Sequence, residues 1–278
     1  MRPFRFGVNM MASGDRAEWV AQCRRAEEIG YDVLLVPDHL GMPAPFPALM
    51  AAADATERVR VGTFVLNAAF WNPTLLAREV TTLEQLSGGR FELGLGTGYN
   101  RAEFDQAGLP FGSPGERVSY LEKLVDGLEL ESTPLLLGGN GDRMLRLAAR
   151  TADTVAFAGA SLKPGSTTGE LVLRSAAELD GRVALVAESA GERDPERNLL
   201  VQAVSIVEDR RAAMAELQKR FEVDYLSVDE LLELPTLLLG TVDEIVAQLH
   251  AARERFGITY FTVLQPDLEA LAPVMGEL

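Results

Sequence analysis

The sequence contains one cysteine, two histidines and three lysines among 278 residues, and each scarcity excludes a kind of chemistry. A single cysteine rules out an intramolecular disulfide, and the apolar, helix-like surroundings of Cys23 indicate a small buried thiol rather than a nucleophile. No apolar run approaches about 18 residues, so the sequence offers no membrane-spanning helix. The N-terminus runs directly into a strand pattern without an apolar signal region, and we therefore expect a cytoplasmic protein.

Further absences narrow the possible activities. Only Lys163 lies outside the expected helices, so a Schiff-base lysine at the end of a strand is not expected. The sequence has no histidine or cysteine spacing typical of a metal site, and it lacks the Gly-x-Ser-x-Gly elbow of serine hydrolases. The net charge of −15 and the pI of about 4.7 argue against a basic surface for nucleic acid. The excess carboxylates indicate solvated helix faces.

Short β-branched and apolar runs alternate with helical patterns along the whole chain. We expect strands at 4–9, 32–36, 60–66, 91–95, 134–138, 153–157, 199–207 and 259–264. Helices are expected at 15–29, 46–57, 73–86, 114–130, 141–150, 168–190, 209–222, 241–256 and 267–277. Strands that alternate with helices pair in parallel with right-handed crossovers, and eight such units close into a barrel. The sequence thus predicts a single (β/α)8 TIM-type barrel domain over residues 1–278.

In such a barrel, polar residues directly after the strands meet at the mouth. Asp38 and His39 follow the second strand. Because His250 is expected on a solvated helix face, His39 is the one imidazole predicted at the mouth. It could act in catalysis or contact a cofactor, or it could only orient its loop. The segment at 159–168, which follows the sixth strand, is either a lid or a plain connector.

Two glycine-rich segments follow the fourth and fifth strands. Gly94, Gly96 and Gly98 alternate in the first segment, which permits close approach of a ligand or of another stretch of backbone. The second segment, 138–143, opens a helix whose free amide N–H groups can bind phosphate, and Arg143 or Arg146 could add a charged contact. The same segment could instead be only a tight strand-to-helix turn.

Together these segments resemble the luciferase-like monooxygenase superfamily, and within it the oxidoreductases that use the deazaflavin coenzyme F420. The resemblance is carried in order by residues 31–40, 61–66 with 72–73, 87–98, 138–153 and 240–261. It implies a (β/α)8 barrel that binds flavin or deazaflavin at its mouth. This chain departs from many relatives in that their long insertion after helix four is shortened here to about 129–133. The resemblance also implies a non-prolyl cis peptide bond between Phe64 and Val65.

The resemblance implies roles for particular residues. His39 would be the proton donor. Some deazaflavin relatives have a glutamate where this chain has Tyr99, so a mechanism that uses that carboxylate cannot be transferred to this chain. Tyr99 is the second candidate proton source. The implied cofactor-binding residues are Asp38, Phe64, Val65, Asn67 and Gly98 at the ring, and Gly139, Asn140, Gly141, Asp142, Arg143, Met144 and Gly159 at the phosphate.

We therefore expect an oxidoreductase that transfers a hydride between coenzyme F420 and a small organic substrate. Three alternatives stay open: an FMN-dependent monooxygenase of the same superfamily, a non-catalytic flavin-binding paralogue, and a barrel lyase or isomerase for phosphorylated metabolites. We also expect a homodimer that binds neither nucleic acid nor a membrane.

Overall fold

The computed structural model describes residues 2–11, 14–128, 130, 132–163, 165–166 and 170–278. Its parallel strands form a closed ring, because β3 pairs with β2 on one side and with β5 on the other. The short β4 (Leu66–Asn67) follows β3 and also pairs with β5. The predicted (β/α)8 barrel is therefore confirmed. In ring order the strands are β3 (Arg60–Thr63), β2 (Val33–Val36), β1 (Arg5–Asn9), β13 (Tyr260–Leu264), β10 (Glu196–Leu200), β7 (Thr154–Phe157), β6 (Leu135–Gly138) and β5 (Phe91–Gly96).

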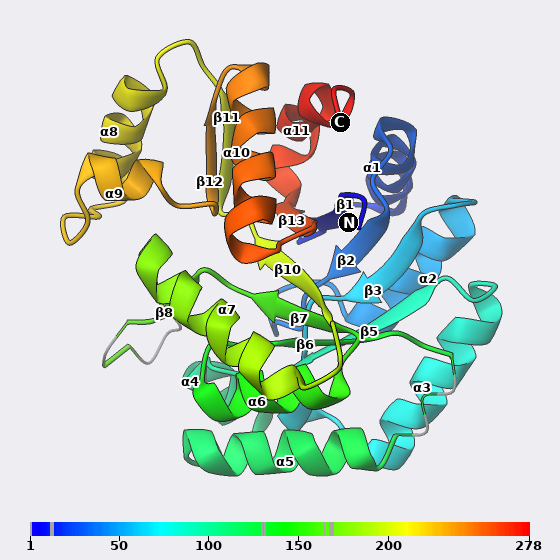
Figure 1. Ribbon diagram of the computed structural model, residues 1–278. Helices are drawn as coiled ribbons and strands as arrows, with labels where there is room; N and C mark the ends of the chain where they lie inside the picture. The colour runs from blue at the N-terminus through cyan, green and yellow to red at the C-terminus, as the bar shows by residue number, and fades with distance from the viewer. Residues whose placement is uncertain (1, 12–13, 129, 131, 164, 167–169) are drawn as a thin grey trace.

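Helices surround this ring of strands (Figure 1). They are α1 (Arg16–Ile29), α2 (Pro45–Ala55), α3 (Pro73–Leu86), α5 (Pro114–Asp126), α6 (Asp142–Thr151), α7 (Ala176–Ala190), α10 (Val242–Phe256) and α11 (Leu268–Met275). The short α4 (Arg101–Ala107), which the sequence analysis did not predict, lies between β5 and α5. Three-residue 3-10 turns, η1 (Ala68–Phe70) and η2 (Gln265–Asp267), follow β4 and β13.

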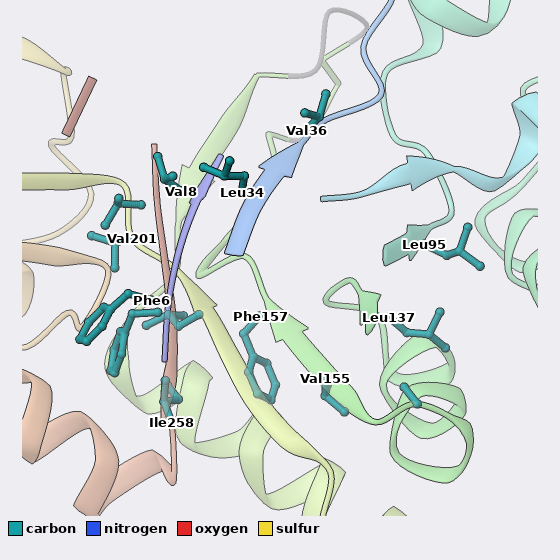
Figure 2. Close-up of a cluster of buried hydrophobic side chains, with 14 of the residues drawn as sticks. Phe6, Val8, Leu34, Val36, Leu95, Leu137, Val155, Phe157, Val201 and Ile258 are labelled. Carbon is teal, nitrogen blue, oxygen red and sulfur yellow. The ribbon is translucent and has the colours of Figure 1, made fainter. Parts of the chain in front are cut away.

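Alternate residues of each strand face opposite sides of the barrel wall. Phe6 and Val8 of β1 point outward into the apolar layer between strands and helices, which Figure 2 shows. Gly7 points inward, because a Cβ atom there would lie 3.0 Å from both Leu35 and the hydroxyl of Tyr260. Leu35 and Tyr260 belong to a smaller apolar cluster inside the barrel.

The amino-terminal end of the barrel interior is closed by ion pairs. Oε1 of Glu92 lies 2.6 Å from both Nη2 of Arg5 and Nε of Arg60. Arg5 also contacts Glu196 at 2.7 Å, and its guanidinium lies 4.4 Å from the centre of the Tyr260 ring. The Glu92 side chain is only 9% exposed, whereas Arg5 and Arg60 are 24% and 32% exposed, and the ion pairs join β1, β3, β5 and β10.

The strand expected at 199–207 is wrong, because the chain leaves the barrel in the middle of that apolar run. The barrel strand β10 ends at Leu200, and β11 (Ala203–Ile206) pairs in parallel with β12 (Leu237–Gly240) in a separate two-stranded sheet. The backbone N–H of Gln202 donates to the carbonyl of Thr236 at this point. Between β11 and β12 the chain forms α8 (Arg210–Arg220) and α9 (Val228–Leu232), which stand apart from the ring in Figure 1.

The helices expected at 168–190 and 114–130 are also too long. Ser175 and Glu178 form a capping box, so α7 starts at Ala176. Before it, β8 (Ala160–Leu162) and β9 (Leu171–Leu173) form an antiparallel pair. Residues 164 and 167–169, within or next to the expected lid, lie outside the described residues. The other helix, α5, ends at Asp126, and positions 129 and 131 of the expected short connection to β6 are likewise outside them.

Cys23 is fully buried on α1, and burial raises the pKa of its thiol to about 12. The interpretation of a small buried thiol is confirmed. Within the part of the chain that the structure describes, no helix has both the length and the apolar character needed to cross a membrane.

Candidate functional site at the barrel mouth

The carboxyl end of β3 forms one side of the mouth. The Phe64–Val65 peptide bond is cis, as predicted. The three alternating glycines at the end of β5 make room for this segment, so the close approach comes from the protein's own chain. A Cβ atom at Gly94 would collide with the carbonyl of Thr63, one at Gly96 would lie 2.8 Å from Cγ2 of Val65, and one at Gly98 would collide with the side chain of Asn67.

Asp38 ties the end of β2 to the segment after β4. Its Oδ2 accepts a hydrogen bond from the backbone N–H of Asn67 and another from the indole N–H of Trp71, both at 3.1 Å. Burial raises the pKa of this carboxyl group, and the two hydrogen bonds act in the opposite direction. Asn67 is itself buried, and its Oδ1 accepts from the N–H of Ala69, so it caps the turn η1. Asp38 therefore holds the wall of the mouth in place.

His39 lies beside a carboxylate that the sequence analysis missed. Its Nδ1 is 2.8 Å from Oε1 of Glu103, and the two side chains are 29% and 15% exposed. The ring of Tyr99 meets the imidazole edge to face, with centroids 5.8 Å apart. Burial and the nearby Glu103 charge raise the pKa of the Tyr99 hydroxyl. His39 and Tyr99, the two predicted catalytic residues, are thus in contact with each other.

The other histidine differs from its expected place on a solvated surface. His250 is half-buried, and its ring packs edge to face on Phe4 at 5.3 Å. Nη2 of Arg253 lies 2.8 Å from Nδ1 of His250. A guanidinium only donates hydrogen bonds, so this Nδ1 is an acceptor and the ring proton sits on Nε2.

The turn between β6 and α6 contains the predicted phosphate-binding residues. Gly141 is the N-cap of α6, and no side chain caps the helix there. A Cβ atom at Gly141 would meet nothing within 4 Å, whereas one at Gly139 would lie 2.7 Å from Cγ of the buried Met144. Nδ2 of Asn140 donates to the carbonyl of Ala160, which joins this turn to β8. Among the described residues, no side chain thus caps the first-turn amides of α6.

The charged residues at this turn differ from those predicted. Arg143 is directed to α5, where it donates to Gly115 at 3.0 Å and pairs with Glu122. Instead, Arg182 of α7 lies at the N-terminus of α6, where it pairs with Asp142 and donates to the carbonyl of Asn140 at 3.3 Å. No sequence signal singles out Arg182, because it lies in the middle of a helix.

Gly159 adopts a positive φ of 63° after β7, and a Cβ atom there would collide with Thr236. It therefore packs against the segment that leads into β12, next to Ala160. A cavity of about 470 Å³ lies on this side, between the β8–β9 pair and α8. Among its lining residues are Ala160, Gln202, Leu217, Tyr225 and Leu237. In the ring, β7 lies four strands from β2, so this cavity is on the opposite side from His39.

Asn9 is a further polar residue that the sequence analysis missed at the mouth. It ends β1 and shares the inward face with Gly7, two residues earlier. Only 6% of the residue is exposed, and its buried Oδ1 has no hydrogen-bond partner among the residues that the structure describes. Such a group is destabilising unless a ligand or water satisfies it, so Asn9 is a candidate ligand contact.

Comparison with known proteins supports the resemblance seen in the sequence. The family model described as luciferase-like monooxygenase matches residues 1–124. The 5,10-methylenetetrahydromethanopterin reductase of Archaeoglobus fulgidus is 26% identical over 173 residues, which cover 54% of this chain and 52% of that protein. The F420-dependent glucose-6-phosphate dehydrogenase of Intrasporangium calvum is 37% identical over 119 residues, 39% of this chain and 36% of that protein. The matched part thus spans about half the length of the first of these relatives, and less of the second.

Solved structures share the fold over nearly the whole chain. The coenzyme F420-dependent tetrahydromethanopterin reductase from Methanopyrus kandleri superimposes with a TM-score of 0.73 at 17% identity and covers 99% of both chains. The monooxygenase RslO1 from Streptomyces bottropensis gives 0.72 at 18% identity, with 98% of this chain and 99% of that chain covered. At these identities the likeness shows the fold alone.

Proposed function

We propose that this chain is a member of the luciferase-like monooxygenase superfamily and an oxidoreductase that transfers a hydride between coenzyme F420 and a small organic substrate. The proposal rests on one observation: the start of α6, which no described side chain caps, lies at the same barrel mouth as the His39–Glu103 pair. A helix N-terminus of this kind binds phosphate, and an imidazole at the same mouth exchanges protons. The relative named as F420-dependent is 37% identical over the part that matches, which favours the deazaflavin.

The residues present fit a phosphate-bearing ring cofactor. Gly141 leaves open space before the free amides of α6, and Arg182 adds a positive charge there. The unpartnered Oδ1 of Asn9 offers an acceptor at the mouth. The ring would be bordered by Phe64, Val65, Asn67 and Gly98, and the phosphate by the turn from Gly139 to Met144. In this arrangement Arg143 supports α5, and Arg182 supplies the charge that we expected from Arg143.

Each side chain then has a separable task. Bound F420 supplies the carbon that accepts or returns the hydride. Asp38 keeps the segment after β4 in place through Asn67 and Trp71. His39 exchanges the proton that accompanies hydride transfer, and Tyr99 packs on its ring.

A fluorescence titration with F420, FMN and a sugar phosphate tests the proposal. We expect a Kd of about 1 µM or lower for F420, corresponding to about −8 kcal/mol. Gly141→Leu and Arg182→Met should each weaken F420 at least about tenfold, or about 1.4 kcal/mol. Arg143→Met is the matched control, because its guanidinium is bound to α5, and it should leave the Kd unchanged.

The alternatives give different results in the same titration. Tight binding of FMN with weak binding of F420 would instead favour a flavin-dependent monooxygenase. Binding of the sugar phosphate alone would favour a lyase or isomerase. If neither ring compound binds, both oxidoreductase proposals are wrong.

A further inference from the structure

Glu103 occupies a defined position on a short helix that begins directly after the glycine-rich end of β5. The side chain of Asn100 caps α4 by accepting from the N–H of Ala102 at 3.1 Å. Glu103 is the third residue of that helix, and its own N–H donates to the carbonyl of Asn100 at 3.2 Å. This turn brings its carboxylate, 15% exposed, against Nδ1 of His39. Helix α4 thus supplies a carboxylate beside His39, although this chain has Tyr99 where some relatives have a glutamate.

Other charged groups near the imidazole have different partners. Asp38, the nearest carboxylate in sequence, accepts hydrogen bonds from Asn67 and Trp71 through Oδ2. Tyr99 contacts the imidazole edge to face through its ring. Glu103 is therefore the group that decides which ring nitrogen of His39 carries the proton.

We propose that Glu103 is a positioning residue that keeps a proton on Nδ1 of His39 and so leaves Nε2 to exchange a proton with the substrate. An ionised carboxylate only accepts hydrogen bonds, so the nitrogen that faces it must be protonated. The neutral ring then has its lone pair on Nε2. The edge contact with Tyr99 limits rotation of the ring out of this orientation.

The catalytic part of this inference rests on the proposed function. Bound F420 would be the two-electron acceptor for a hydride from a substrate C–H bond. The adjacent O–H or N–H group of the substrate would then lose its proton to Nε2 as a C=O or C=N bond forms, and His39 would become an imidazolium whose charge Glu103 balances. In the reverse direction Nε2 returns the same proton. Glu103 itself neither gains nor loses a proton.

The position of the ring proton is measurable without any ligand, by ¹⁵N NMR of the full chain, with the pH raised until the histidine signals no longer change. The chain has only two histidines, so His250 is an internal reference. We expect opposite tautomers, with the proton of His39 on Nδ1 and that of His250 on Nε2. Nε2–H as the main form of His39 in the unmodified protein would overturn the proposal.

Variants separate positioning from catalysis. Glu103→Ala should move the His39 proton to Nε2 in most molecules, while His250 stays unchanged. Asp105→Asn is the matched control, because it changes an exposed carboxylate of α4 that pairs with Arg101 at 3.8 Å rather than with His39. An unchanged His39 tautomer in Glu103→Ala would refute the positioning role.

Steady-state kinetics then test the catalytic part. With F420 bound, Glu103→Gln should lower kcat about 10- to 100-fold, the usual loss when a partner that orients an imidazole is removed. KM and the Kd of F420 should stay within about twofold. An unchanged kcat would refute the catalytic part. A protein that shows the expected tautomers but does not bind F420 refutes the proposed function and leaves the positioning role supported.

Discussion

Replacing Gly96 by alanine tests the packing that shapes the mouth. The new methyl group would lie 2.8 Å from Cγ2 of Val65 and 3.4 Å from the carbonyl oxygen of Gly138. The first distance is too short for carbon atoms, and the second leaves little room on the other side. Overpacking of this kind costs about 1–3 kcal/mol, and we expect the free energy of unfolding to fall by that amount.

A double-mutant cycle identifies the cause. Val65→Ala removes two methyl groups worth roughly 0.8 kcal/mol each when buried, and it also removes the colliding atom. The double variant should therefore be more stable than the sum of the single changes predicts, by about 0.5–3 kcal/mol. Urea unfolding followed by circular dichroism measures all four proteins. Gly41→Ala is the control, because a Cβ there meets nothing within 4 Å. Additive effects would show that Val65 does not fill the space above Gly96.

Two further predictions concern buried carboxylates. Glu92→Gln removes the negative charge that Arg5 and Arg60 share. It should lower the free energy of unfolding, measured in urea, by about 2–4 kcal/mol, which is less than for fully buried pairs because both arginines reach solvent. The affinity for F420 should not change. Burial raises the pKa of Asp38 above its unfolded value of about 4, so the folded state binds this proton more tightly than the unfolded state does. The free energy of unfolding therefore decreases as pH rises from about 4 through the folded pKa. Asp38→Asn should therefore be more stable relative to the unmodified protein at about pH 7 than at about pH 4, and an equal difference at both pH values in urea unfolding would contradict this.

The barrel could be predicted because most of its strands are short apolar runs between helical patterns. The errors arose where apolar sequence continued past a change of direction. Residues 199–207 form one β-like run, yet Gln202 bonds to Thr236 and directs the chain into a separate sheet. Pairing with a segment more than thirty residues away leaves no local signal. A second error arose at Leu171–Leu173, because an apolar segment of this kind also fits the start of a helix.

The candidate site was predictable only where its residues follow strands directly. Asp38 and His39 could be found in this way, and so could the glycine turn before α6. Glu103 and Arg182 lie on helices, where a charged residue is usually solvated. Asn100 followed three residues later by Glu103 resembles a helix start and could have revealed α4, but not the direction of the carboxylate. The contacts that make Glu103 and Arg182 candidate site residues form only in the folded chain.

Ring closure through β1 and β13 also has a consequence for synthesis of the protein. Arg5 is paired with Tyr260, so the first strand gains its second neighbour only when the end of the chain is available. Until then β1 and β10 each have an unpaired edge on which other nascent chains can add strands. A ribosome that stalls before residue 260 would release an open, curved sheet instead of a barrel. The last strand, which carries none of the predicted site residues, thus determines whether the newly made chain becomes a closed barrel or a partner for aggregation.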